Sequence, residues 1–203
     1  VRKDSQKKFD AIAKKAGWDM KRVTVVHGDM TKPRCGLTPA QLRTLTGKVK
    51  HFFHLAAIYD LTATREAQQA ANIDGTQHAL DLAAALKAGC FHHTSSIAAA
   101  GLYPGIFRED MFDEAEGLDD PYLRTKHESE GLVRNEKRIK WRIYRPGMVV
   151  GHSKTGEIDK IDGPYYFFTL IKKLRELLPQ WVPVLGIEGG RINIVPVDFV
   201  ADA

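Results

Sequence analysis

The sequence predicts an α/β fold built on a doubly wound parallel sheet. Short apolar runs alternate along the chain with long stretches of helical spacing. The runs are apolar almost throughout, which is typical of strands that are buried on both faces. A length of 203 residues with 43% hydrophobic and 27% charged side chains suits one large globular domain and argues against a disordered or fibrous chain.

The N-terminal quarter is expected to form a helix, two strands and a short connecting helix. Residues 3–20 place apolar side chains at helical spacing. The β-branched run 22–27 (RVTVVH) ends at Gly28 and predicts a buried strand. A short polar helix is expected to end near Thr46, and residues 49–55 (VKHFFHL) predict a second strand.

The rest of the chain continues the alternation of strands and helices. An alanine-rich stretch is closed by Gly89, as expected just past the end of a helix. The expected elements are a helix over 65–87, a strand over 90–96, a helix over 122–137, a strand over 141–145, a helix over 165–178 and a late strand over 191–197.

Chemically informative residues follow the predicted strands. Ligands of open parallel sheets bind outside the carboxyl ends of the strands. Gly28-Asp29 follows the first strand, the second ends in His-Leu-Ala-Ala at 54–57, Ser95-Ser96 ends the third, and Pro146-Gly147 ends the fourth. We therefore expect the functional site along this edge of the sheet.

Together with Ser96, the segment Tyr122-Leu-Arg-Thr-Lys126 at the start of a helix resembles the active site of the extended short-chain dehydrogenase/reductases, which have Rossmann-like folds. Segment 72–76 (NIDGT) and Arg145-Pro146-Gly147 also match that superfamily in order. Within it, segments 149–157 and 193–198 resemble those of fatty acyl-CoA and other thioester reductases.

The resemblance has one departure. The first βα unit, with its glycine-rich phosphate loop, is absent, because the chain starts where the family's second strand should end. We therefore expect residues 1–203 to be a partial NAD(P)-binding reductase domain, truncated at the N-terminus and before most of the substrate-binding region.

The resemblance implies a role for each site residue. Tyr122 would donate a proton to the substrate oxygen, and Lys126, one helical turn on, would lower the pKa of the phenol and hold the ribose of the cofactor. Ser96 would hydrogen-bond the carbonyl oxygen, while its neighbour Ser95 points the other way in an extended strand. For Asn72, a water-linked proton relay and a structural role are both open.

The resemblance also implies NADPH as cofactor. Asp29 would accept a hydrogen bond from the adenine, or it caps its own turn. Arg2 and Lys3 would bind the 2′-phosphate, or they are ordinary solvated charges. Four small residues would lie behind the cofactor or beside the nicotinamide: Ala56, Ala57, Pro146 and Gly147.

Other ligands and compartments are disfavoured. His54, His92 and His93 fit no metal site, because alternate strand positions face opposite sides. Cys35 and Cys90 fit no metal spacing either, and we interpret them as reduced thiols of a cytoplasmic protein. The net charge of +5 is modest, so we expect no nucleic acid, and no apolar run approaches the roughly 20 residues of a membrane span.

The expected function is NADPH-dependent reduction of a fatty acyl thioester, carried by coenzyme A or a carrier protein, to the aldehyde and on to the alcohol. The apolar residues of 165–187 would hold the acyl chain, or they pack against another part of the protein. Alternatives are a sugar-nucleotide epimerase or dehydratase, another carbonyl reductase, and a dinucleotide-binding sensor or scaffold without turnover. The oligomeric state is left open.

Overall fold

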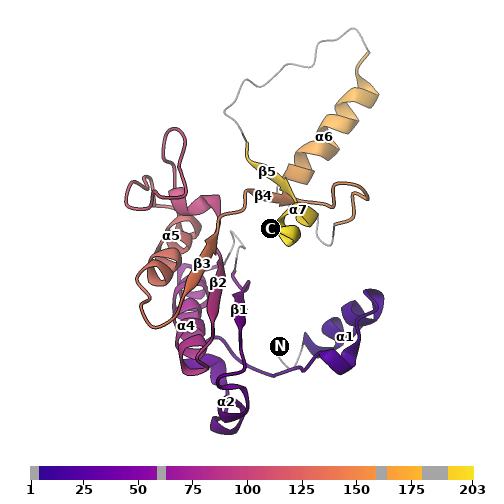
Figure 1. The fold of residues 1–203 in the computed structure, drawn as a ribbon. Helices are drawn as coiled ribbons and strands as arrows, with labels where there is room; N and C mark the ends of the chain where they lie inside the picture. Colours follow the sequence, from indigo (N-terminus) through magenta and orange to yellow (C-terminus); the bar gives the residue numbers. More distant parts are fainter. Residues whose placement is uncertain (1–4, 59–62, 159–163, 180–191) are drawn as a thin grey trace. The chain divides into compact units, whose positions relative to one another are not determined.

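The chain forms two compact units, Val1–Arg145 and Pro146–Ala203. Their folds are described by a computed structural model that covers residues 5–58, 63–158, 164–179 and 192–203 (Figure 1). Each unit contains its own parallel sheet, of three strands in the first and two strands in the second.

The sheet of the first unit has the order β1-β2-β3, with β1 at His51–His54, β2 at Cys90–Thr94 and β3 at Trp141–Tyr144. All neighbours are parallel, and the register places Phe52 opposite Phe91, which lies opposite Trp141. These strands lie within three of the predicted segments, and each is shorter than predicted.

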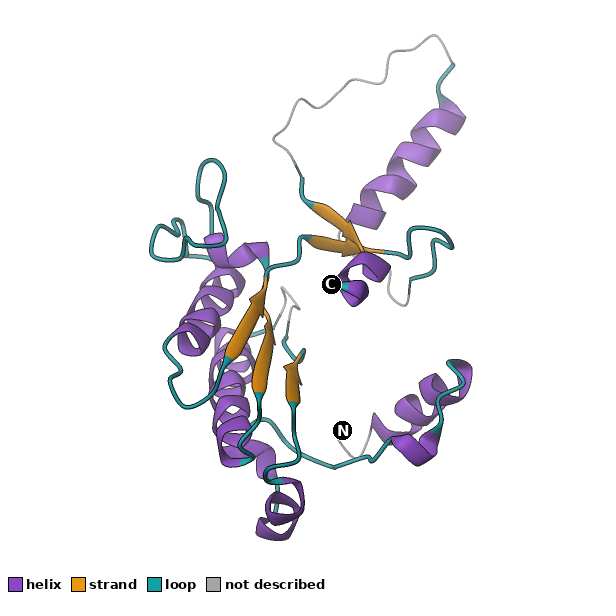
Figure 2. Ribbon diagram, in the orientation of Figure 1, coloured by secondary structure: helices purple, strands orange, loops and turns teal. Residues whose placement is uncertain are grey.

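Two long helical elements pack on one face of this sheet. The first runs through α3 (Arg65–Gln68), a six-residue π-helix η4 (Gln69–Asp74) and α4 (Gly75–Ala85), and the second is α5 (Pro121–Arg134). Figure 2 shows α4 and α5 on the same side of the three strands.

The core of the first unit lies between these helices and the strands. It consists of apolar side chains from α4, α5 and β2, among them Leu80, Phe91 and Val133. On the other face of the sheet, Phe53 is 60% exposed. The predicted class, a parallel-sheet α/β fold of Rossmann-like type, is confirmed.

The N-terminal region is helical, but its predicted strand is absent. It contains α1 (Gln6–Lys15), two short 3-10 helices, η2 (Met20–Arg22) and η3 (Pro33–Gly36), and α2 (Pro39–Leu45). The prediction of a strand over 22–27 was wrong: the structure assigns none there. A β-branched run becomes a strand only where another strand completes its hydrogen-bond ladder, and the described sheet ends at β1 and β3.

The second unit pairs β4 (Met148–Val150) with β5 (Ile194–Pro196) in parallel. It also contains α6 (Pro164–Leu177) and α7 (Val197–Asp202). The predicted late strand is confirmed in shortened form, because α7 begins at Val197. The sequence did not predict β4, a three-residue strand whose partner lies far along the chain. None of the described helices is long and apolar enough to cross a membrane.

Candidate active site

The start of α5 places Tyr122 and Lys126 at the edge of the three-stranded sheet. Asp120 caps the helix, since its Oδ1 accepts hydrogen bonds from the backbone N–H of Tyr122 at 2.9 Å and of Leu123 at 3.1 Å. Pro121 occupies the first turn, where its missing N–H costs nothing. Lys126 follows Tyr122 by one turn and therefore lies on the same face of the helix.

Ser96 lies two residues beyond β2 and caps the 3-10 helix η5 (Ile97–Ala100), its Oγ accepting from the N–H of Ala98 at 3.1 Å. The Ser96 side chain also lies beside the Tyr122 phenol, since hydrogen bonding with Ser96 acts to lower the pKa of Tyr122. The structure therefore brings together a hydroxyl and a phenol that are 26 positions apart in the sequence.

The pKa of Tyr122 differs from the sequence-based expectation. Burial raises it above the ordinary value, and the hydrogen bond with Ser96 opposes that rise only in part. Lys126 is not among the causes of this shift, so its effect on the phenol stays a prediction. The Lys126 ammonium instead donates to the carbonyl oxygen of Thr94, at 3.1 Å. Tyr122 is thus a neutral phenol at neutral pH, the form that a proton donor requires.

Lys126 is almost completely buried, with 4% of its surface exposed. Burial lowers its pKa to about 8, although the negative charge of Glu130 works in the opposite direction. The nearby imidazoles of His54 and His93 have pKa values of about 4 and about 3, lowered first by burial. Both imidazoles are neutral at neutral pH, so Lys126 is the cation among these three side chains.

Asn72 lies in the π-helix and ties three parts of the first unit together. Its side chain accepts from the N–H of Ile58 at 2.7 Å and donates to the carbonyl of Ile58 at 2.9 Å and to Oγ1 of Thr125 at 3.2 Å. Thr125 lies between Tyr122 and Lys126 on α5. These contacts support the structural role, and the relay role stays a hypothesis.

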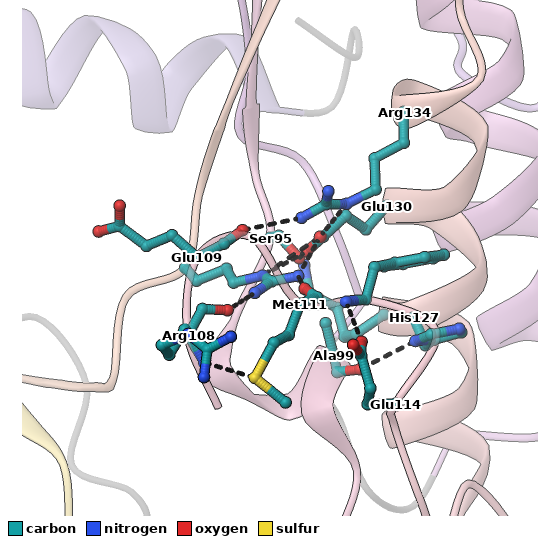
Figure 3. Close-up of polar contacts among 12 residues, drawn as sticks. Ser95, Ala99, Arg108, Glu109, Met111, Glu114, His127, Glu130 and Arg134 are labelled. Carbon is teal, nitrogen blue, oxygen red and sulfur yellow. Dashed lines mark hydrogen bonds and ion pairs between the residues drawn. The ribbon is translucent and has the colours of Figure 1, made fainter. Parts of the chain in front are cut away.

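A buried ion network beside this group was not predicted. Glu130 is fully buried and accepts hydrogen bonds from Ser95 and Arg134 (Figure 3). It also accepts from Arg145. The sequence did carry a signal for it. Tyr122, Lys126, Glu130 and Arg134 recur every four residues and therefore form one polar stripe along a largely buried helix.

The residues proposed for the adenine and the 2′-phosphate are only partly described. Oδ1 of Asp29 accepts from the N–H of Thr31 at 3.0 Å and from its hydroxyl at 2.7 Å, which supports the turn-capping role. Its Oδ2 lies 3.9 Å from Nζ of Lys32. Arg2 and Lys3 lie outside the described residues.

The four small residues expected around the cofactor lie just after strands. Ala56 and Ala57 follow β1 and are exposed. Pro146 and Gly147 open the second unit. A Cβ added at Gly147 would lie 2.4 Å from the carbonyl oxygen of Asn193, so the close approach of β4 to the chain before β5 explains the glycine.

Within the described residues, no group of three or more His, Cys, Asp or Glu side chains could hold a metal ion. The side chain of His54 bonds Oγ1 of Thr76 at 2.9 Å, and His92 bonds His51 and Tyr144 at 3.0 and 2.9 Å. These contacts agree with the structural interpretation of both histidines.

Comparison with known proteins identifies the family. The family model described as "Male sterility protein", an NAD-binding domain, matches residues 2–203. The chain belongs to this family. The male sterility protein family thus accounts for essentially the whole sequence and agrees with the extended short-chain dehydrogenase/reductase fold.

Two curated relatives are 31% identical to this member of the family. One protein of the linear gramicidin synthase of Brevibacillus parabrevis matches 89% of the chain over 4% of its own length. Glycine betaine reductase ATRR of Emericella nidulans matches 91% of the chain over 14% of its own length. The chain therefore spans only a small part of each of these relatives.

Solved structures agree with the fold. The terminal R domain from the myxalamid PKS-NRPS biosynthetic pathway is 28% identical to this chain and superposes on it with a TM-score of 0.78. The match covers 100% of this chain and 52% of the length of the R domain chain. A UDP-N-acetylglucosamine 4-epimerase from Methanobrevibacter ruminantium M1 is 17% identical to this chain and superposes with a TM-score of 0.64. The match covers 91% of this chain and 57% of the epimerase chain. The second likeness shows the fold alone.

Proposed function

We propose that this domain reduces a thioester-bound acyl group with NADPH, and that Tyr122 is its proton donor. The observation that carries the proposal is the placement of Ser96 beside the Tyr122 phenol, at a strand end and one helical turn from a buried lysine. Membership of an NAD-binding family supports a nicotinamide cofactor. A relative named as a reductase and a structural neighbour from a PKS-NRPS pathway support a thioester substrate.

The residues of the site fit such a cofactor. A lysine ammonium can donate three hydrogen bonds, and among the described residues that of Lys126 donates one, to Thr94. Further donors are therefore available for the ribose hydroxyls. The exposed Ala56 and Ala57 leave room for a flat ring after β1. Bound NADPH would supply a hydride to the carbonyl carbon of the thioester.

The chain's own groups would handle the charge that develops on oxygen. As the C=O π bond breaks, its electron pair moves to the oxygen, which the Ser96 hydroxyl stabilises. Tyr122 then transfers its phenolic proton to that oxygen, and Lys126 stabilises the phenolate left behind. The resulting hemithioacetal loses the thiol to give the aldehyde. A second hydride and a second proton would give the alcohol.

For the acyl group we propose a chain with a substantial apolar part. Several of the described apolar side chains of α6 are exposed, with Phe168 at 48% and Leu170 at 53%. Burying each methylene is worth about 0.8 kcal/mol, so such a surface favours a long chain. The predicted contribution of residues 181–187 lies outside the described residues.

The substrate test uses the full-length protein with NADPH. It compares acyl-CoA thioesters of increasing length, the same acyl groups on a phosphopantetheinyl carrier protein, and a sugar nucleotide, by loss of nicotinamide absorbance and by trapping the aldehyde. Catalytic efficiency should rise with acyl length and then level off. Conversion of the sugar nucleotide with no reduction of any thioester would overturn the proposal in favour of an epimerase or dehydratase.

NADPH is proposed over NADH because of Arg2 and Lys3. A charge-assisted hydrogen bond to a phosphate is worth roughly 1.5–3 kcal/mol, which is about tenfold or more in affinity. Arg2→Ala should therefore raise KM for NADPH by about tenfold and leave KM for NADH unchanged. Equal use of both cofactors by the unmodified protein would contradict the assignment.

A further inference from the structure

Three side chains donate hydrogen bonds to one buried carboxylate, that of Glu130. Oε2 of Glu130 accepts from the hydroxyl of Ser95 at 2.7 Å, and Oε1 accepts from Arg134 at 2.8 Å (Figure 3). Oε1 also accepts from Arg145, at 2.6 Å. Glu130 is fully buried and Arg145 is 13% exposed at its side chain. The network therefore joins the end of β2, the middle of α5 and the end of β3.

The same guanidinium of Arg145 also fixes a loop. Nη1 of Arg145 donates to the carbonyl of Arg108 at 3.0 Å, and Nη2 donates to the carbonyl of Met111 at 2.7 Å. Its Cζ lies 4.9 Å from the centroid of the Phe107 ring. This loop is part of the chain that runs from Ser96 to Tyr122. Arg145 therefore holds the middle of the connection between these two residues.

The carboxylate is charged at neutral pH. Burial alone would raise the pKa of Glu130, but hydrogen bonds from Arg145, Ser95 and Arg134 outweigh burial and place the pKa below its usual value. A buried ion network contributes little to the net free energy of folding, because the cost of desolvating the ions offsets their attraction. Fixing one geometry is a better-attested use of such a network than stability.

We infer that Glu130 and Arg145 are positioning residues of the reductase site. Glu130 acts through Ser95, and Arg145 acts through the loop at 107–111. Together they fix the position of Ser96 relative to Tyr122. The inference rests on the proposed function, since it assigns these residues to the same proton-transfer group. Neither side chain needs to touch the substrate, because each fixes backbone or side chains next to a residue that does.

The test uses three variants of the full-length protein. Ser95→Ala removes one hydrogen bond to Glu130 and leaves both arginines paired. Arg145→Lys keeps the charge but loses the geometry that reaches Arg108 and Met111 together. Arg138→Lys is the matched control, because Arg138 precedes β3 as Arg145 follows it and is also ion-paired, to Asp81 and Glu136.

Two measurements decide between positioning and a merely structural role. The first is kcat per NADPH-binding site, with KM for NADPH and the melting temperature measured in parallel. Misplacement by about 1 Å costs on the order of 100-fold, so Ser95→Ala and Arg145→Lys should lose roughly 10–100-fold in kcat while KM for NADPH stays within about threefold. Arg138→Lys should keep the kcat of the parent.

The second measurement is hydrogen exchange of the amides of 96–112, which does not require turnover. Exchange there should be faster in Ser95→Ala and Arg145→Lys than in Arg138→Lys. Unchanged exchange, or a kcat loss no greater than that of the control, would overturn the inference. If the parent reduces no thioester, the proposed function fails, while the exchange measurement still tests how the network fixes this segment.

Discussion

At the scale of single residues, Tyr122 can be tested by removing one oxygen. Tyr122→Phe keeps the shape and burial of the ring but removes the acid, so kcat should fall by about 10²–10⁴-fold. NADPH affinity, followed by nicotinamide fluorescence, should stay within a few-fold of the parent. Ser96→Ala serves as a comparison that keeps the acid but loses its hydrogen-bond partner. Near-normal turnover in Tyr122→Phe would show that the proton comes from another group.

Lys126 should make the reaction sensitive to alkaline pH. Its pKa is lowered to about 8, so the ammonium form is complete below that pH and is lost as the pH rises through it. The groups around it on α5, β1 and β2 are Glu130, His54 and His93. The imidazoles are already neutral there, and the pKa of Tyr122 lies higher. A plot of kcat/KM for NADPH against pH should therefore fall with an apparent pKa near 8.

Lys126→Arg is the control for this profile, because arginine stays charged throughout the range. In this variant the alkaline fall near pH 8 should disappear in whatever activity remains. A fall at the same pH in both proteins would assign the titration to a group other than Lys126.

The proposed site residues could be selected from sequence patterns, but their electrostatics could not. The spacing of Tyr122 and Lys126 within one helix and the position of Ser96 after a strand are local patterns. The pKa values depend instead on burial and on side chains from other elements. The Thr94 carbonyl that holds Lys126, and the pairing of Ser95 with Glu130, link segments about 30 residues apart.

At the scale of elements, the π-helix should depend on Asn72. Asn72→Ala leaves the partly buried N–H and carbonyl of Ile58 and the buried hydroxyl of Thr125 without these partners, which should cost about 2–4 kcal/mol of unfolding free energy. Gln77→Ala is the control on the same helix. Its side chain bonds Asp81 four residues on, a contact worth roughly 0.2–0.5 kcal/mol. Urea denaturation of both variants measures the difference.

The same variant bears on the relay hypothesis. If Asn72 is only structural, kcat per NADPH-binding site should be unchanged in the fraction of Asn72→Ala that is folded. A drop in kcat per site greater than tenfold, at unchanged NADPH affinity, would instead favour the relay.

The β4–β5 pair should be sensitive to Gly147. Gly147→Ala brings a methyl group against the backbone of Asn193, so β4 must shift and weaken the hydrogen bond from Met148 N–H to the Asn193 carbonyl, now 2.8 Å. Hydrogen exchange at 148–150 and 194–196 should accelerate. Gly156→Ala, at a positive φ of 68° with nothing nearby, controls for backbone strain alone and should leave that exchange unchanged.

Helices and strands of the first unit were predictable because their patterns are local. The apolar runs gave β1, β2 and β3, and helical spacing gave α4 and α5. The failures are the strand expected over 22–27 and the unpredicted β4. In both, the outcome depends on whether a distant segment supplies a hydrogen-bonding neighbour, which the local residues do not encode.

At the scale of the whole molecule, the chain divides at Arg145 and Pro146. The sequence marks this point only as a turn after a strand. The division becomes visible when packing is known, because the buried core of the first unit draws on Cys35, on apolar residues between Ala79 and Ala88, and on Phe91 and Val133, all before the boundary. The Ser96–Tyr122–Lys126 group lies in the first unit, and the apolar helix α6 lies in the second.

The two neighbouring serines limit how this site can be diversified. Extended backbone turns successive side chains to opposite sides, so Ser95 serves the ion network while Ser96 meets Tyr122. Inserting or deleting one residue within 90–94 would exchange the two serines and disconnect both at once. At the nearby loop tip around Gly105, by contrast, the side chain of Ile106 is 82% exposed. Natural variation and directed evolution should therefore find tolerated length changes at this tip and almost none in the strand.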